Sequence, residues 1–304
     1  MELLWIPISM FAGLIQAVRT AAQKDLNAHL STVVTTYVRS IFGFPFILIY
    51  LACLVYFLDE AIPRVHALFF VNALGAAITQ LLATAFLIHL FTLRNFAVGT
   101  NLSRTDVMMT AIIGSLFFSE DLSVSGWIAI TLTVIGVIIM SVAKSNLGAS
   151  LNSRGDLAKT LFSRSTLIGL LTGFCFCLSY LFLREASLSL EGSFILRAAT
   201  TLVCVLGIQV LIGVFWLYRF EPEAVGKIGV RFKLCTFVGI TSALGSIGWF
   251  TAMTLQNASY VRAVAQVEAI FIILISVLYF REKILLSELF GIAIIVAGIL
   301  LFVL

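Results

Sequence analysis

Charged residues are scarce in this chain. Lysine, arginine, aspartate and glutamate make up 11% of its 304 residues, whereas 61% are hydrophobic. A soluble domain carries about twice that share of charge, so the composition excludes an ordinary soluble domain. The cysteines all fall in apolar segments without metal or redox spacing: Cys53, Cys175, Cys177, Cys204 and Cys235. We therefore expect free thiols, no metal site and no cofactor.

Catalytic motifs are also missing. A membrane enzyme needs a nucleophile, a metal site or a phosphate-binding loop. The sequence has no His/Asp cluster, no glycine-rich phosphate loop and no serine with a matching base. We therefore expect that the protein is not an enzyme. The net charge of +4 comes from basic residues in short loops beside apolar segments, so we expect no nucleic-acid partner.

Apolar segments long enough to cross a bilayer as helices recur along the whole chain. The sequence predicts ten of them, at roughly residues 4–23, 33–57, 68–91, 96–118, 126–143, 167–184, 193–218, 234–255, 259–280 and 286–303. The first lacks a basic leader and a cleavage site, which indicates a retained helix rather than a signal peptide. The expected fold class is an all-α polytopic membrane protein embedded in the lipid bilayer.

The chain repeats itself. Residues 79–142 align with residues 241–304 without a gap at an offset of 162, so that Asp106 corresponds to Glu268. The longest gap between spans, 144–166, acts as a central loop between a first five-helix repeat (1–143) and a second (167–304). Because five is odd, the second repeat must enter the membrane from the opposite side. The pattern predicts two inverted five-helix repeats around a central cavity, as in secondary transporters.

Both repeats close with the same motif. Phe118-x-Glu120 is followed sixteen residues later by Gly136, and Phe280-x-Glu282 is followed in the same way by Gly298. With its ten spans in two halves, the chain resembles EamA-type members of the drug/metabolite transporter superfamily over almost its whole length. The resemblance implies a basket-like bundle with alternating access and the export or exchange of small organic solutes. We expect the protein in a bacterial inner (plasma) membrane.

The basic residues favour one orientation. Of the 19 lysines and arginines, twelve lie in loops on the side of the central loop, two lie on the side of the termini, and five lie within spans. The positive-inside rule then places the central loop in the cytoplasm and both termini outside. The resemblance implies cytoplasmic termini instead, and both orientations stay open.

The first span carries a polar stripe. Gln16, Arg19, Thr20 and Gln23 share one helix face. Such a stripe should face the protein interior or a hydrated cavity, because lipid would leave it without hydrogen bonds. We expect Gln16, Arg19 and Thr20 to bind substrate, and the alternative is a hydrogen-bonded seam between helices.

Two corresponding spans carry the other polar candidates. One face of each holds possible substrate-binding residues: Asn101, Arg104 and Thr105 in the fourth span, and Arg262 and Gln266 in the ninth. Asp106 and Glu268 lie on another face of the same helices. We expect the first face to line the cavity and the two acids to point to a neighbouring helix.

Two buried arginines provide possible partners for these acids. Arg39 and Arg197 correspond to each other in the repeat. They could form two ion pairs, Arg39 with Asp106 and Arg197 with Glu268, or the crossed arrangement. In the alternative interpretation, Asp106 or Glu268 carries a coupling proton.

The substrate is predicted from the remaining cations. Arg19 and Arg104 have no basic counterpart in the other repeat, and a guanidinium fork binds a carboxylate, sulfonate or phosphate. We expect transport of an amino acid or another small organic anion. The alternatives are export of cationic or neutral drugs or metabolites, or a channel. Further candidates for the cavity wall are Tyr37, Gln80, Tyr180 and Trp249.

Two acidic residues at the ends of spans and three glycines within spans complete the predictions. Glu120 and Glu282 are expected to cap the helix that follows each of them. Gly136 in the fifth span, and Gly291 and Gly298 in the last, allow close helix approach. We expect these glycines to serve packing within a monomer, and a dimer contact is the alternative.

Overall fold

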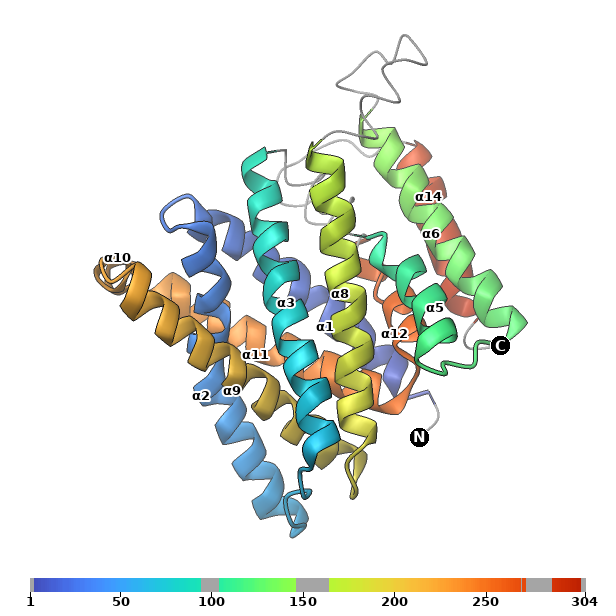
Figure 1. Ribbon diagram of the computed structural model, residues 1–304. Helices are drawn as coiled ribbons and strands as arrows, with labels where there is room; N and C mark the ends of the chain where they lie inside the picture. The colour runs from blue at the N-terminus through green and yellow to red at the C-terminus, as the bar shows by residue number, and fades with distance from the viewer. Residues whose placement is uncertain (1–2, 94–103, 146–163, 269, 272–285, 302–304) are drawn as a thin grey trace.

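The computed structural model describes residues 3–93, 104–145, 164–268, 270–271 and 286–301 (Figure 1). Regular structure in these ranges is entirely helical. The helices are α1 (Trp5–Asn27), α2 (Thr32–Leu58), α3 (Ala67–Leu93), α5 (Asp106–Phe117), α6 (Val124–Ser145), α8 (Arg164–Leu188), α9 (Phe194–Phe220), α10 (Ala224–Val230), α11 (Phe232–Leu255), α12 (Ala258–Val264) and α14 (Leu286–Leu300).

Five of the described helices are long and apolar enough to cross a membrane: α2, α3, α8, α9 and α11. Helix α1 has a similar length of 23 residues, but its polar stripe makes it less apolar. Parts of the predicted spans 96–118 and 259–280 lie outside the described residues. The fold is therefore that expected of a polytopic membrane protein, and the five long apolar helices lie close to five of the ten predicted spans.

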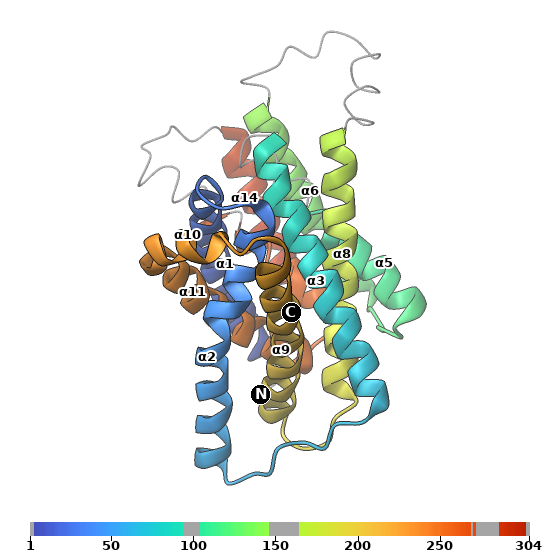
Figure 2. The same cartoon turned by 60° about the vertical axis from the view of Figure 1, so that its left-hand side comes forward.

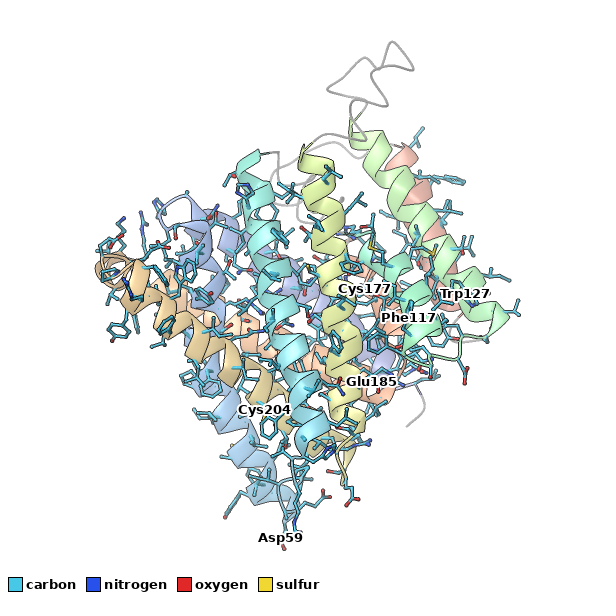
Figure 3. All side chains as sticks on the ribbon, in the orientation of Figure 1. Asp59, Phe117, Trp127, Cys177, Glu185 and Cys204 are labelled. Atoms are coloured by element: carbon cyan, nitrogen blue, oxygen red, sulfur yellow. The ribbon has the colours of Figure 1, made fainter. Side chains whose placement is uncertain are left out.

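The outside of the bundle is apolar and its interior is partly polar. Leu211 is 73% exposed and Phe117 is 76% exposed, whereas Arg39 is only 2% exposed. Figure 3 shows Phe117 on α5 near the edge of the bundle, and Asp59 at one extreme end of the molecule, where α2 stops. Apolar residues outside and ionic residues inside suit a surface that faces lipid.

The bundle is built from helix pairs that combine the two halves of the chain. Helix α3 lies beside α8, α1 beside α11, and α2 beside α9 (Figures 1 and 2). Helices α6 and α14 form a fourth pair at the edge of the bundle. The main hydrophobic core likewise contains residues from both halves, such as Phe69 and Phe250. The two halves thus build one common core.

Helices α6 and α14 approach each other closely at two glycines. A Cβ atom on Gly136 would lie 2.8 Å from the carbonyl oxygen of Gly291, and one on Gly298 would lie 2.7 Å from Cγ2 of Thr133. Early residues of α6 meet late residues of α14, so the helices are antiparallel. The predicted role of these glycines in packing within the chain is confirmed.

Candidate substrate-binding site

Two small adjoining cavities lie among the helices. The first cavity is lined by Gln16, Thr20, Leu87, Arg104, Asp106, Phe176, Tyr180, Arg262 and Glu268. The second cavity is lined by Gln16, Arg19, Arg39, Gln80, Thr84, Phe176, Tyr180, Leu183, Ser246, Trp249 and Phe250. Because Gln16, Phe176 and Tyr180 line both, these three side chains form the boundary between the cavities. Both cavities draw residues from both halves of the chain.

A buried ion pair between α5 and α12 borders the first cavity. Nη2 of Arg262 lies 2.7 Å from Oδ2 of Asp106, and Nε of Arg262 donates to the same oxygen at 2.9 Å. The guanidinium carbon of Arg262 lies 4.7 Å from the ring centre of Tyr180 and 5.1 Å from that of Trp249. Two aromatic rings and a carboxylate therefore fix the orientation of Arg262.

Arg104 enters the same cavity just before α5. Its Nη1 donates to Oε1 of Gln266 at 3.0 Å. Nε2 of Gln266 donates in turn to the backbone carbonyl of Arg262 at 3.3 Å. Gln266 thus joins Arg104 to α12, which carries Arg262, and the two halves of the chain meet at this contact.

Glu268 differs from its counterpart Asp106. It is 8% exposed and lines the first cavity. Its carboxylate makes no hydrogen bond or ion pair with any described residue, although it experiences the positive charges of Arg104, Arg262 and Arg19. Asp106 is held by Arg262, whereas no described residue makes a hydrogen bond or ion pair with the Glu268 carboxylate.

A network of amide side chains holds Arg39 in the second cavity. Nη2 of Arg39 donates to Oε1 of Gln80 at 2.9 Å and to Oε1 of Gln209 at 3.0 Å. Gln209 also accepts a hydrogen bond from Oγ of Ser40 at 2.7 Å and donates to Gln80 at 2.8 Å. Helices α2, α3 and α9 are joined here by neutral groups, which position the guanidinium without neutralising it.

The polar stripe of α1 faces the protein interior, as predicted, and its residues Gln16, Arg19 and Thr20 line the cavities. Nη2 of Arg19 donates to Oε1 of Gln16 at 3.3 Å, and Nε1 of Trp249 donates to the same oxygen at 2.9 Å. Thr20 lines the first cavity and Arg19 lines the second. Gln16 therefore links α1 to α11 at the boundary between the two cavities.

A second buried network joins the halves at the start of α12. The carboxylate of Glu120 accepts hydrogen bonds from the backbone N–H of Ala258 at 2.6 Å and of Ser259 at 3.3 Å, and from the Ser259 hydroxyl. Nε of Arg184 lies 3.6 Å from Glu120. Arg184 also donates to the carbonyl oxygens of Met253 and Gln256 at the end of α11.

The predicted capping role of Glu120 is wrong in its target. Glu120 caps α12, in the other half of the chain, rather than α6, which follows it. The turn between Glu120 and α6 brings the carboxylate back toward α12, where the first N–H groups need acceptors. Glu282 lies outside the described residues.

The predicted ion pairs of Arg39 and Arg197 are also wrong. Arg39 contacts Gln80 and Gln209, because α2 packs along α9 and not along α5. Arg197 is half-buried, and no ion pair joins it to Glu268 among the described residues. Asp106 instead pairs with Arg262.

Other predicted positions differ as well. Asp106 and Glu268 line the first cavity together with Arg104, whereas they were expected to point away from it. Tyr37 packs against Gly213 of α9, where a Cβ atom would lie 2.7 Å from the Tyr37 ring, and it lines neither of the two cavities. Thr105 is half-buried just before α5 and is also absent from both linings. Asn101 lies outside the described residues.

Several residues of the site were missed by the sequence analysis. Gln209 is a fully buried glutamine in an apolar helix, which is itself a signal for a polar partner. Ser246 and Phe176 correspond in the repeat to Thr84 and Gln16. Extending the candidate Gln16 to its counterpart would have identified Phe176, whereas Thr84 was not itself a candidate.

The second half of the sequence and the fold of the chain are each similar to known proteins. Residues 163–304 match the EamA-like transporter family. No curated protein matches the sequence. A solved structure, titled only as the crystal structure of a protein, is similar to this one with a TM-score of 0.68 and 14% sequence identity, over 98% of this chain and 95% of that chain. This likeness shows a shared fold and carries no information on substrate.

Proposed function

We propose that this chain is a secondary transporter for a small organic anion. Its residues 163–304 belong to the EamA-like transporter family of the drug/metabolite transporter superfamily. It is an integral, multi-pass membrane protein. The observation that carries the proposal is the pair of buried polar cavities inside an apolar bundle. Ionic side chains are costly within a membrane unless a polar solute or a partner uses them.

The mechanism we propose is alternating access by two inverted repeats. Corresponding residues line the cavities in pairs: Gln16 with Phe176, Thr20 with Tyr180, Thr84 with Ser246, and Asp106 with Glu268. Arg104 contacts Gln266, its own counterpart at an offset of 162. The helix pairs α3 with α8 and α1 with α11 correspond to each other in the same way. These observations support an axis through the cavities, about which the halves rock.

The charge of the site supports an anionic substrate. Four guanidinium groups and two carboxylates line the two cavities, which leaves a formal charge of +2. An amino acid or another organic anion would reduce this excess through hydrogen bonds to guanidinium groups. One observation favours a second candidate, export of a cationic drug or metabolite: the Glu268 carboxylate, which has no hydrogen-bond partner among the described residues, faces the first cavity.

We place the protein in a bacterial inner membrane with its central loop in the cytoplasm, because twelve loop lysines and arginines lie on that side against two on the other. We propose that it works as a monomer. The small residues of α6 and α14 already pack against each other within one chain.

Uptake of radiolabelled small organic anions into proteoliposomes tests the function. We expect Arg19→Ala and Arg104→Ala to abolish uptake while both variants still purify as folded protein. Arg197→Ala is the matched control, because Arg197 is an in-span arginine outside both linings. Unchanged uptake in Arg19→Ala and Arg104→Ala would contradict the proposed anion site. Uptake of an organic cation that depends on Glu268 would favour the second candidate.

A further inference from the structure

The two cavities differ in charge. In the first, Asp106 and Glu268 balance Arg104 and Arg262, so the formal charge is zero. The second contains Arg19 and Arg39, and none of its lining residues is acidic. The whole excess of +2 is therefore located in the second cavity.

No acidic side chain among the described residues pairs with either arginine of the second cavity. The hydrogen bonds of Arg39 go to Gln80 and Gln209, and that of Arg19 goes to Gln16. Arg39 is 2% exposed and Arg19 is 8% exposed, yet the Nε–H group of each has no hydrogen-bond partner among the residues that the structure describes. The two guanidinium groups also repel each other, and the nearest negative charge that acts on Arg19 among the described residues belongs to Glu268, in the first cavity. Two buried cations that pair with no described acidic residue are costly unless a ligand supplies the opposite charge.

The residues around the two arginines suit a small organic molecule that carries a polar group. The amides of Gln16 and Gln80 and the hydroxyl groups of Thr84 and Ser246 supply uncharged hydrogen-bonding groups. The rings of Phe176 and Tyr180 lie nearly parallel, at an interplanar angle of 8° and 5.8 Å between their centres, and form one wall. A few charged groups among apolar walls are typical of a small-molecule site.

We propose that the second cavity binds a doubly charged anionic group of the substrate, a phosphate monoester or a dicarboxylate, between Arg19 and Arg39. This inference rests on the proposed function and narrows its substrate class. Two guanidinium forks can bind two oxygen pairs of a dianion, and both positive charges are then matched. Arg39 thereby becomes a substrate-binding residue, held in place by Gln80 and Gln209.

Binding to purified protein in lipid nanodiscs, followed by isothermal titration calorimetry, tests the charge requirement. The probes are glycerol 3-phosphate, succinate and the permanently monoanionic isethionate. We expect at least one of the two dianions to bind at pH 7.5 at least tenfold more tightly than isethionate, and the probe that does so identifies the source of the charge. If glycerol 3-phosphate is preferred, that preference should shrink at pH 5, because the second pKa of a phosphate ester is about 6. The isethionate affinity at both pH values controls for changes in the protein.

Variants assign the site to the two arginines. Arg19→Gln and Arg39→Gln should each reduce the preference for the dianion over isethionate by tenfold or more, since a hydrogen bond to a charged group contributes that much. Arg39→Lys should keep part of the preference, which guards against a variant that merely fails to fold. Arg197→Gln, at the counterpart of Arg39, should leave it unchanged.

Equal affinities for all three probes, or an unchanged preference in Arg39→Gln, would overturn the inference. The proposed function fails separately. If proteoliposomes take up isethionate as well as dianions, the transport function is supported and the dianion site is excluded. Dianion binding without uptake of any anion would retain the site and exclude transport.

Discussion

Removal of the Glu120 carboxylate should weaken the junction between the two halves. Glu120 is 4% exposed and accepts hydrogen bonds from Ala258 and Ser259 while it lies beside Arg184. Each hydrogen bond to a charged group contributes about 1.5–3 kcal/mol, but bonds to one acceptor are not additive. Loss of one member of a buried pair costs about 3–5 kcal/mol. We expect Glu120→Ala to lower the free energy of unfolding by about 3–5 kcal/mol.

Two further variants test whether the loss of stability comes from the Glu120 carboxylate itself. Glu120→Gln keeps one oxygen acceptor, so it should cost only about 1–2 kcal/mol. Glu185→Gln is the control, because Glu185 follows Arg184 on α8, is half-buried and makes no side-chain hydrogen bond with a described residue (Figure 3). It should change the free energy of unfolding by no more than about 0.5 kcal/mol.

The assay is reversible unfolding by SDS in mixed micelles, followed by tryptophan fluorescence. We expect Glu120→Ala to be the most destabilised variant, Glu120→Gln the next and Glu185→Gln the least. If Glu120→Ala unfolds at the same SDS fraction as Glu185→Gln, the carboxylate does not hold the halves together and the argument is refuted.

The remaining predictions use the same SDS assay or proteoliposomes. Asp106→Ala removes the partner of Arg262 and should lower the free energy of unfolding by about 3–5 kcal/mol. The double variant Asp106→Ala with Arg262→Met should regain most of this loss. No recovery in the double variant would contradict the pairing. Gly136→Leu and Gly298→Leu should each cost about 1–3 kcal/mol or more, since each inserts a side chain into the α6–α14 contact, and wild-type stability in either would exclude that contact. Substrate flux should follow an imposed pH gradient and lose that dependence in Glu268→Gln, because Asp106 is held by Arg262; flux indifferent to the gradient in the wild type would indicate uniport or exchange.

Helix positions follow closely from the sequence because bilayer thickness fixes the length of an apolar span. The span predicted at 33–57 is α2, Thr32–Leu58. The inward direction of the α1 stripe was predictable for a similar reason, since lipid provides no hydrogen bonds to Arg19 or Thr20. Both results depend on local pattern and on the solvent alone.

The partners of the buried charges could not be predicted in this way. Arg39 was expected to meet an acid, but α2 packs along α9 and brings Gln209 to it. The repeat indicates which residues correspond to each other, and it does not indicate which of them touch. Asp106 and Glu268 occupy corresponding positions, yet only Asp106 is paired among the described residues, because Arg262 has no charged counterpart in the first repeat.

The central claim is that the cavities open in turn to the two sides of the membrane. Ser246→Cys, in a variant without the five native cysteines, places one thiol in the lining of the second cavity. Its reaction with a membrane-impermeant thiol reagent is then measured in vesicles of both orientations. The account predicts modification from both sides and protection by the transported anion. Modification from one side only, whatever the substrate or gradient, would contradict it.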